Sequence, residues 1–595
     1  MHVLFLLVAI LSQTLAFNAP SGVSTWCGKP YMSTNHSLDP GGQFQFPVLQ
    51  SEPLLYITIQ PRYSLFLESD KDGAFIVDAS ISHFFGGSYK NVTYDIPESN
   101  ISSPFTTLDI EIYNEELGAL IVTNKVSINS TGNLIEFSFL SFPARLEPYL
   151  VSILATSPER QQSYTATTRI YVLPSRDYGS AVKIDNLFGG LYVQNAKNNW
   201  KGWYAVFPNG YYADGSYVTP DNVSLSNLEA YAALGFNTIN IVPDGGLPDQ
   251  SYPTEQLIEY WNKLDELNLF NLYDMRFAFQ NSTRISEQVN LWKNRTTLLS
   301  WYTADEPDGW AYPLNSTSLS YAQLRSLDPY HPVSLVLNCQ NFYYPEYAAG
   351  ADIIFQDAYP VAINATWSIP WNTPCNETYG DCGCDNCLGE LEDVASRLDD
   401  IQSYQAYIGP GSQGGLRKPT WSVVQAFGEQ QYWQKTPSAE EVEVMMMLSV
   451  NHDAKGITYW IYPSTDSVNV GSGVLGKVLQ SEPAIDFLFG TNAIKGLGNG
   501  QLDVSVWILE DQMMVGIVNG GYVDSKNEVT INLPAYVTSI NQPLYGGSNW
   551  TVSDGKVSKS GLRGLEVDIL VVDIKYSIAS SKQDARGRNV YRDEL

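Results

Sequence analysis

Apolar and polar residues alternate along the first third of the chain. From about residue 40 to residue 175, short runs of alternating apolar and polar positions are separated by Gly, Asn and Asp, and no helical period of similar strength is present. Such runs are typical of half-buried strands, and many in succession predict a β-sandwich. The clearest runs are residues 54–59, 73–77, 134–139 and 168–172.

The middle of the chain has a different pattern. From about residue 184, strand-like apolar runs alternate with segments of helical period, and the pair repeats eight times, which is what a (β/α)8 barrel requires. No Gly-x-Gly-x-x-Gly turn of a dinucleotide-binding sheet follows the first run. The expected strands are 190–193, 237–242, 270–277, 298–303, 333–337, 351–355, 420–424 and 456–461, and a long helix is expected over 438–452 with Ser438 as its N-cap.

After about residue 490 the strand pattern returns and predicts a second, smaller β-sandwich. The expected fold class is therefore multidomain, with a central TIM barrel between two all-β domains. The expected boundaries are a signal peptide at 1–16, an N-terminal β-sandwich at 17–178, the barrel at 184–490, a C-terminal β-sandwich at 491–577 and a flexible tail at 578–595.

The two ends of the chain predict a secretory route. The apolar run over 3–11, followed by small residues up to Ala16, is typical of a signal peptide. The last four residues, Arg-Asp-Glu-Leu, resemble the KDEL-type retention signal. We therefore expect the endoplasmic reticulum lumen and a retention receptor as partner, with secretion as the alternative. No stretch reaches the roughly 18 apolar residues of a membrane helix, so no membrane span is expected.

Sequons and cysteines fit this compartment. Clustered thiols in an oxidising lumen are expected to form two disulfides, whereas a zinc site is disfavoured by the single residue between Cys382 and Cys384. A long-range bridge between Cys27 and Cys339 stays open. The clustered cysteines are Cys375, Cys382, Cys384 and Cys387, and the expected glycan acceptors are Asn35, Asn91, Asn100, Asn129, Asn222, Asn281, Asn294, Asn315, Asn364, Asn376 and Asn549.

Charge and composition narrow the class of ligand. With 34 Lys and Arg against 63 Asp and Glu, the formal net charge is -29, which repels phosphate backbones, so no nucleic-acid partner is expected. Fourteen Trp and 38 Tyr supply aromatic faces of the kind that stack on sugars. The five His have no metal-ligand spacing, so neither a metal nor a cofactor is expected.

The most informative motif follows the fourth expected strand. In such barrels, functional residues gather at the carboxyl ends of the strands, where Asp305-Glu306-Pro307 stands. Strand alternation would place Glu306 on the same face as Ala304 and Tyr302 and aim it into the mouth of the barrel. Two adjacent carboxylates in an apolar setting repel one another, so one of them should keep its proton near neutral pH, as cleavage of a glycosidic bond requires.

This motif resembles the Asn-Glu-Pro of retaining glycoside hydrolases of the large (β/α)8 clan, in which the Glu is the acid/base. The resemblance covers the barrel and the appended C-terminal β-domain, and it implies that Glu306 is the acid/base and that the substrate is a carbohydrate. The nucleophile of the clan is a Glu at the end of strand seven, where this chain has Gln425. Glu429, four residues later, and Asp357, at the end of the sixth strand, are the two candidates for the second carboxylate.

Other residues at the strand ends are candidates for sugar binding. We expect Asp274 and Arg276 to form a polar floor, Gln425 to bind a hydroxyl group, and the aromatic residues Tyr359, Trp433, Trp460 and Tyr462 to form stacking walls. Two alternatives stay open. Adjacent Asp305 and Glu306 also resemble hexosaminidases that use the acetamido group of the substrate, and a barrel without catalysis could bind glycans. A Ser-His-Asp triad has no nucleophile elbow to support it.

Overall fold

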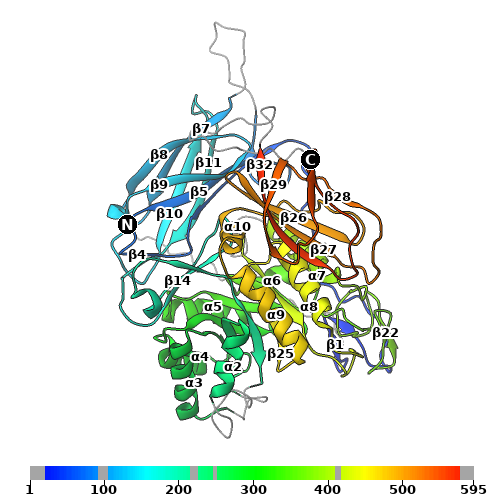
Figure 1. Ribbon diagram of the computed structural model, residues 1–595. Coiled ribbons are helices and arrows are strands. Elements are labelled where there is room, and N and C mark those ends of the chain that lie inside the picture. Colours follow the sequence, from blue (N-terminus) through cyan, green and yellow to red (C-terminus); the bar gives the residue numbers. More distant parts are fainter. Residues whose placement is uncertain (1–20, 91–104, 215–224, 245–250, 409–416, 576–595) are drawn as a thin grey trace.

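Eight parallel strands close into a barrel, as the strand–helix alternation predicts (Figure 1). The structure is a computed structural model that describes residues 21–90, 105–214, 225–244, 251–408 and 417–575. In barrel order the strands are β16 (Asn209–Ala213), β17 (Thr238–Asn240), β18 (Phe270–Asp274), β19 (Leu298–Asp305), β20 (Val333–Leu337), β21 (Ile353–Gln356), β24 (Thr420–Gln425) and β25 (Ile457–Tyr462).

Helices follow the barrel strands and cover their outer side. The expected helix over 438–452 is confirmed as α8, and Ser438 and Glu441 form a reciprocal capping box at its start. The helices of the described residues are α2 (Ser226–Leu234), α3 (Thr254–Leu267), α4 (Ser282–Trp292), α5 (Ser316–Leu327), α6 (Tyr344–Ala348), α7 (Asp393–Tyr407), α8 (Ala439–Asn451), α9 (Asp466–Leu479) and α10 (Ala484–Gly490), with short 3-10 turns at Phe139–Ser141 and Ala196–Asn198.

The expectation that residues 190–193 form the first barrel strand is wrong. They belong to an antiparallel sheet of β13 (Ala181–Ile184), β14 (Leu191–Gln194) and β15 (Tyr204–Val206), and the barrel begins one element later with β16. Side chains of this sheet share one buried cluster with the barrel interior. Residues 185–189 lie against Pro419 and Lys455, just before β24 and β25 begin, so the sheet closes the amino-terminal end of the barrel. A short apolar run has the same sequence pattern in a barrel strand and in a strand of this antiparallel sheet, so the pattern does not distinguish the two.

The N-terminal β-sandwich is confirmed, and its sheets pack around one buried core. One sheet has the order β11-β10-β7-β8 and the other β6-β3-β5-β9. Burial in β3 alternates along the whole strand, as the sequence pattern predicts. The strands are β3 (Leu54–Pro61), β5 (Gly73–Ser82), β6 (Gly87–Ser88), β7 (Thr107–Asn114), β8 (Ala119–Ser127), β9 (Ser130–Phe137), β10 (Tyr149–Thr156) and β11 (Ser163–Ile170), beside a short pair of β4 (Phe66–Leu67) and β12 (Val172–Leu173).

The C-terminal β-domain has a sheet of order β26-β27-β32-β29 and a smaller one of order β28-β31-β30. Trp507 and Met514 from this domain lie in the core cluster of the barrel and its helices, so the two parts share a continuous apolar core. The strands are β26 (Leu502–Leu509), β27 (Gln512–Asn519), β28 (Val529–Ile531), β29 (Tyr536–Tyr545), β30 (Thr551–Ser553), β31 (Lys556–Lys559) and β32 (Val567–Lys575).

His452 joins the barrel to the C-terminal domain. Its Nδ1 lies 2.8 Å from Asp399 in α7, and its Nε2 lies 3.0 Å from Asp503 in β26. Burial opposes the charged ring, but hydrogen bonds to both carboxylates outweigh burial and raise the pKa of His452 to about 9. The charged ring therefore stabilises the fold fully below its unfolded pKa, near 6.5, and this contribution is lost as the pH rises through about 9.

We expect the His452→Gln substitution to lower the free energy of unfolding by ~2 kcal/mol at pH 6, because it removes one member of a largely buried ion cluster. Urea titration at pH 6 and at pH 10 measures the difference between the variant and the wild type. The difference should shrink at pH 10, where the wild-type ring is neutral. An equal difference at both pH values would contradict this assignment.

The residues before the N-terminal sandwich take an unexpected course. Residues 25–44, the N-terminal strap, run to the far side of the barrel, where β1 (Thr25–Trp26) and β2 (Lys29–Pro30) lie close to β22 (Trp367–Ser368) and β23 (Thr373–Pro374) (Figure 1). The Cys27–Cys339 disulfide fixes this arrangement, so the long-range bridge that the sequence left open is present. A Cβ atom on Gly28, whose φ is +73°, would lie 2.5 Å from the Phe342 ring, which explains why glycine follows Cys27.

Several sequence predictions fall on residues that are not described. The signal peptide, the tail with its retention signal, and the sequons at Asn91, Asn100 and Asn222 lie outside the described residues. Among the other sequons, Asn35 is half-buried, and the exposed ones are Asn129, Asn281, Asn294, Asn315, Asn364, Asn376 and Asn549. Within the described part of the chain, every helix is too short or too polar to cross a membrane.

Candidate active site

A bulge at the end of β19 decides which carboxylate enters the barrel mouth. Between Tyr302 and Asp305 the pairing with β20 shifts by one residue, so Asp305, and not Ala304, shares the inner face with Tyr302. The expectation that Glu306 shares a face with Ala304 and Tyr302 is therefore wrong: Ala304 lies in the outer cluster between strands and helices. Glu306 follows the strand with φ +48°, and this turn, not strand alternation, directs its side chain.

Glu306 and Asp357 meet at the mouth. Asp357 follows β21 and is 3% exposed, whereas Glu306 stays partly accessible to solvent. Burial, the nearby Asp357 charge and that of Asp305 raise the pKa of Glu306 well above its ordinary value. Burial also raises the pKa of Asp357 to about 6, against a hydrogen bond from Glu306 that lowers it. The pair is therefore arranged to hold one proton near neutral pH, on Glu306.

Asn338 holds the two carboxylates together. It is the first residue after β20, and its Nδ2 donates to Glu306 Oε1 at 3.0 Å and to Asp357 Oδ1 at 3.1 Å. Its own Oδ1 accepts a hydrogen bond of 2.9 Å from the indole nitrogen of Trp26 in the N-terminal strap. The carboxamide is thus fixed in one orientation, with its donor side facing the acids.

Asp308 positions the backbone that carries Asn338. Its carboxylate accepts hydrogen bonds from the backbone nitrogens of Gly309, Asn338 and Cys339 at 2.9, 3.2 and 2.9 Å. Burial raises the pKa of Asp308 to about 7, against these three hydrogen bonds, which lower it. The loop after β19 is therefore tied to the loop after β20 at Asn338, which binds both carboxylates.

Asp274 and Arg276, the two residues of the expected polar floor, form an ion cluster with Asp305. The Arg276 guanidinium binds both Asp274 oxygens, and its Nη1 donates to Asp305 Oδ2 at 2.6 Å. Tyr302 donates to the other Asp305 oxygen at 2.7 Å. Both oxygens of Asp305 are thus bound by protein groups, and Arg276 places a positive charge beside the acids.

Aromatic side chains line two sides of the mouth. The Arg276 guanidinium lies 5.5 Å from the ring centroid of Trp460, which packs against Tyr212 at 5.4 Å. On the other side, the Trp433 ring packs edge-on against Tyr359 at 6.0 Å and donates from its indole nitrogen to the Tyr359 carbonyl at 2.9 Å. These rings belong to the barrel-interior cluster, and Trp433 and Trp460 are only partly buried.

Three other candidates lie elsewhere or are already bound. Tyr462 packs on Tyr211 and Tyr231 in the layer between strands and helices. The Gln425 carboxamide bonds to the backbone of residues 361 and 427, so the structure shows it holding the loops after β21 and β24. Glu429 is exposed in a turn with φ +58°. The structure thus brings Asp357, and not Glu429, to Glu306.

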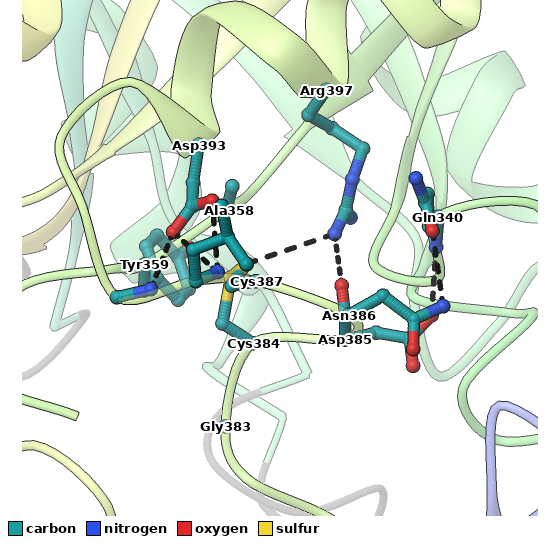
Figure 2. Close-up of a disulfide and its surroundings, with 12 residues drawn as sticks. Gln340, Ala358, Tyr359, Gly383, Cys384, Asp385, Asn386, Cys387, Asp393 and Arg397 are labelled. Carbon is teal, nitrogen blue, oxygen red and sulfur yellow. Dashed lines mark hydrogen bonds between the residues drawn. A yellow bond between two sulfur atoms is a disulfide. The ribbon is translucent and has the colours of Figure 1, made fainter. Parts of the chain in front are cut away.

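The cysteine loop after β21 contains the two expected disulfides. They join Cys375 to Cys382 and Cys384 to Cys387. Figure 2 shows the second one beside Arg397 of α7, which donates to the Asp385 carbonyl, while Gln340 bonds to Asn386. Among the described residues no free cysteine is present.

The structure also contains a Ser-His-Asp arrangement. His331 lies 2.9 Å from Ser180 Oγ through Nε2 and 2.6 Å from Asp328 through Nδ1. All three side chains are buried, and the Ser180 hydroxyl also lies 2.8 Å from the Leu298 carbonyl. A substrate has no access to this hydroxyl, so the triad is structural.

Sequence reasoning missed Trp26, Asn338 and Tyr212. Asn338 directly follows the expected strand 333–337, so the rule that strand ends carry function would have found it. Tyr212 lies on β16, which falls between the expected strands 190–193 and 237–242. Trp26 reaches the site only through the strap, and no local sequence pattern indicates that contact.

Comparison with known proteins gives similarity in fold alone. No protein-family model matches the chain, and no curated protein matches it. Among solved structures, the chain is similar to a debranching enzyme from Nostoc punctiforme, with 10% identity, 58% of this chain and 88% of that chain covered, and a TM-score of 0.39. It is also similar to a β-glucuronidase from Parabacteroides merdae, with 9% identity, 88% and 74% coverage, and a TM-score of 0.31. At this level of similarity, an assignment of function rests on the carboxylates.

Proposed function

We propose that the protein is a glycoside hydrolase with Glu306 as the acid/base and Asp357 as the second carboxylate. The observation that carries the proposal is the Glu306–Asp357 pair at the carboxyl end of a (β/α)8 barrel, where one Asn338 carboxamide binds both carboxylates and burial raises the pKa of each. Aromatic walls beside the pair provide stacking faces for sugar rings. Solved structures of similar fold include glycosidases, in accord with this proposal.

The spacing of the pair favours a retaining mechanism. Both acidic oxygens bind the same Asn338 nitrogen at 3.0 and 3.1 Å, so they are separated by no more than the sum of these distances. That limit lies below the roughly 6.5–9.5 Å of inverting enzymes, which leave room for a water molecule. In retention, Asp357 attacks the anomeric carbon while Glu306 gives its proton to the leaving oxygen. Water then cleaves the glycosyl ester as Glu306 takes up its proton.

The substrate-assisted alternative would use Asp305 in place of Asp357. Each Asp305 oxygen already accepts one hydrogen bond, from Arg276 or from Tyr302, and keeps a second lone pair. We rank this alternative second because Asp357, and not Asp305, shares the Asn338 carboxamide with Glu306. A glycan-binding barrel without catalysis would use the same aromatic walls but would not need the proton on Glu306. Turnover of a panel of aryl glycosides between pH 4 and pH 8 separates these possibilities, and we expect hydrolysis of at least one member.

The dependence of kcat/KM on pH should report the protonation of Asp357 and Glu306. Burial raises the pKa of Asp357 to about 6, so below that pH the group becomes protonated and can no longer act as a nucleophile. We therefore expect kcat/KM to fall tenfold per pH unit below about pH 6 and to fall again at alkaline pH, as Glu306 loses its proton. A profile that stays flat down to pH 4 would contradict the pairing.

We also propose that the enzyme works in the secretory route, in the endoplasmic reticulum lumen if the last four residues are read as a retention signal. Three disulfides and a set of exposed sequons among the described residues support an oxidising, glycan-adding compartment. Deletion of residues 592–595 should release the protein into the medium of expressing cells. Equal retention of the full-length and shortened chains would contradict the retention signal.

A further inference from the structure

A cavity lies next to Trp26, which binds Asn338 of the proposed active site, and its walls come from three separate segments. It has a volume of about 800 Å3 and lies between the N-terminal strap, residues 340–342 after β20, and the cysteine loop. Trp26 lines it and also donates to Asn338, which holds the two carboxylates. We call this cavity the strap cleft. The side chains of Trp26 and Asn338 lie between it and the two carboxylates.

The walls of the strap cleft are held in place by bonds between the segments. Lys29 of the strap lies 2.6 Å from Asp385 of the cysteine loop. Asn386 donates to Gln340 at 3.0 Å, and Arg397 of α7 donates to the Asp385 carbonyl (Figure 2). Arg397 also donates to the Asn338 carbonyl. Together with disulfides in two of the walls, these contacts preform the cleft, which lowers the entropy cost of binding a ligand.

The chemistry of the walls selects the class of ligand. The lining includes the amide side chains of Gln340 and Asn341 and the aromatic rings of Trp26 and Phe342, a combination that provides both hydrogen bonds and apolar faces. The Lys29 charge is paired with Asp385, while Glu377 and Asp381 add negative charge. An anionic ligand is therefore repelled, and an uncharged molecule with many hydroxyl groups fits best.

We propose that the strap cleft is a subsite for an uncharged oligosaccharide, which binds sugar units of the same glycan whose glycosidic bond is cut at Glu306. The inference rests on the proposed glycosidase function, but its own claim is binding outside the catalytic pair. It assigns a role to the strap: through Trp26, which lines the cleft and binds Asn338, the segment adds binding surface beside the two carboxylates.

Binding to the full chain tests the cleft separately from catalysis. The protein is made with Glu306→Gln in the bacterial periplasm, so that disulfides form while Asn376 on the cleft wall carries no glycan. Titration calorimetry then compares pentasaccharides of mannose, glucose and galactose with the matching monosaccharides. We expect at least one pentasaccharide to bind about tenfold or more tightly than its monosaccharide. Equal or absent binding throughout would overturn the proposal.

Two substitutions locate that binding in the cleft. Ala365 lines the cavity and is only partly exposed, so Ala365→Trp should fill the cleft and weaken the pentasaccharide about tenfold. Asn341→Ala removes a polar group of the wall without adding bulk and should weaken it several-fold. Leu388→Trp is the matched control, because Leu388 is 78% exposed in the same loop and does not line the cavity.

Unchanged pentasaccharide binding in both Ala365→Trp and Asn341→Ala would contradict the proposal that the strap cleft is the binding site. Equal weakening by the control Leu388→Trp would contradict it as well. The proposed glycosidase function is tested separately, by measuring hydrolysis of an aryl monoglycoside with proteins that keep Glu306. We expect Ala365→Trp to leave that turnover within about twofold of wild type, because one sugar unit does not reach the cleft. If no pentasaccharide binds but the aryl monoglycoside is hydrolysed, the cleft proposal fails and the glycosidase function stands. If a pentasaccharide binds but no aryl glycoside is hydrolysed, the glycosidase function fails and the binding site stands.

Discussion

Glu306→Gln is expected to lower kcat for an unactivated glycoside by about 1,000-fold or more. Glutamine has nearly the same shape and still accepts the Asn338 hydrogen bond, but it has no proton to give to the leaving oxygen, and general acid catalysis is worth roughly 100- to 10,000-fold. Steady-state kinetics on an alkyl or oligosaccharide glycoside measures the loss. A dinitrophenyl glycoside, whose leaving group needs no proton, should lose much less.

Glu429→Gln is the matched control for this prediction. Glu429 is an exposed glutamate near the end of β24, and the same substitution there should change kcat less than about twofold. Far-ultraviolet circular dichroism checks that both variants fold. Wild-type turnover in Glu306→Gln would remove the basis for the assignment, and a large loss in Glu429→Gln would move the second carboxylate to strand seven.

Asp357→Asn is expected to have a still larger effect, about 10,000-fold in kcat, because it removes the nucleophile and the charge that keeps the proton on Glu306. Added azide can replace the lost carboxylate by attacking the anomeric carbon, and it should restore part of the activity. Because azide attacks only once, the glycosyl azide should have the anomeric configuration opposite to that of the substrate. Product analysis by NMR reads that configuration.

Failure of azide to restore any turnover in Asp357→Asn, with rescue in Glu429→Gln instead, would show that Asp357 is not the nucleophile. The same experiment also tests the acetamido alternative. If the acetamido group of the substrate acts as the nucleophile, Asp305→Asn should cost as much as Asp357→Asn. We expect a smaller loss from Asp305→Asn, because Asp305 is bound by Arg276 and Tyr302 in a supporting position.

The features that sequence predicted well are those set by local chemistry. Strand–helix alternation gave the barrel because every barrel strand is buried and every covering helix needs an apolar face. The start of α8 was predictable because the Ser438–Glu441 capping box satisfies backbone donors within one turn. The two short-range disulfides follow from the crowding of four thiols.

The features that the sequence did not predict depend on contacts between segments that are distant in the chain. Strand alternation predicts Glu306 at the mouth, but the bulge between Tyr302 and Asp305 breaks that alternation. The residues 298–306 contain no sequence signal for the bulge. The apolar run 190–193 has the pattern of a barrel strand because its side chains are buried in the same cluster, at the closed end of the barrel. Trp26 meets Asn338 across a separation of 312 residues.

The carbon-13 NMR titration of glutamate side-chain carboxyl groups tests the shared proton most directly. With labelled glutamate, a resonance that disappears in Glu306→Gln identifies the group. It should titrate well above its ordinary value near 4.5, because burial and the Asp357 charge favour the protonated form, and Asp357→Asn should move it down. A Glu306 signal that titrates near 4.5 in the wild type, unmoved by Asp357→Asn, would contradict the account.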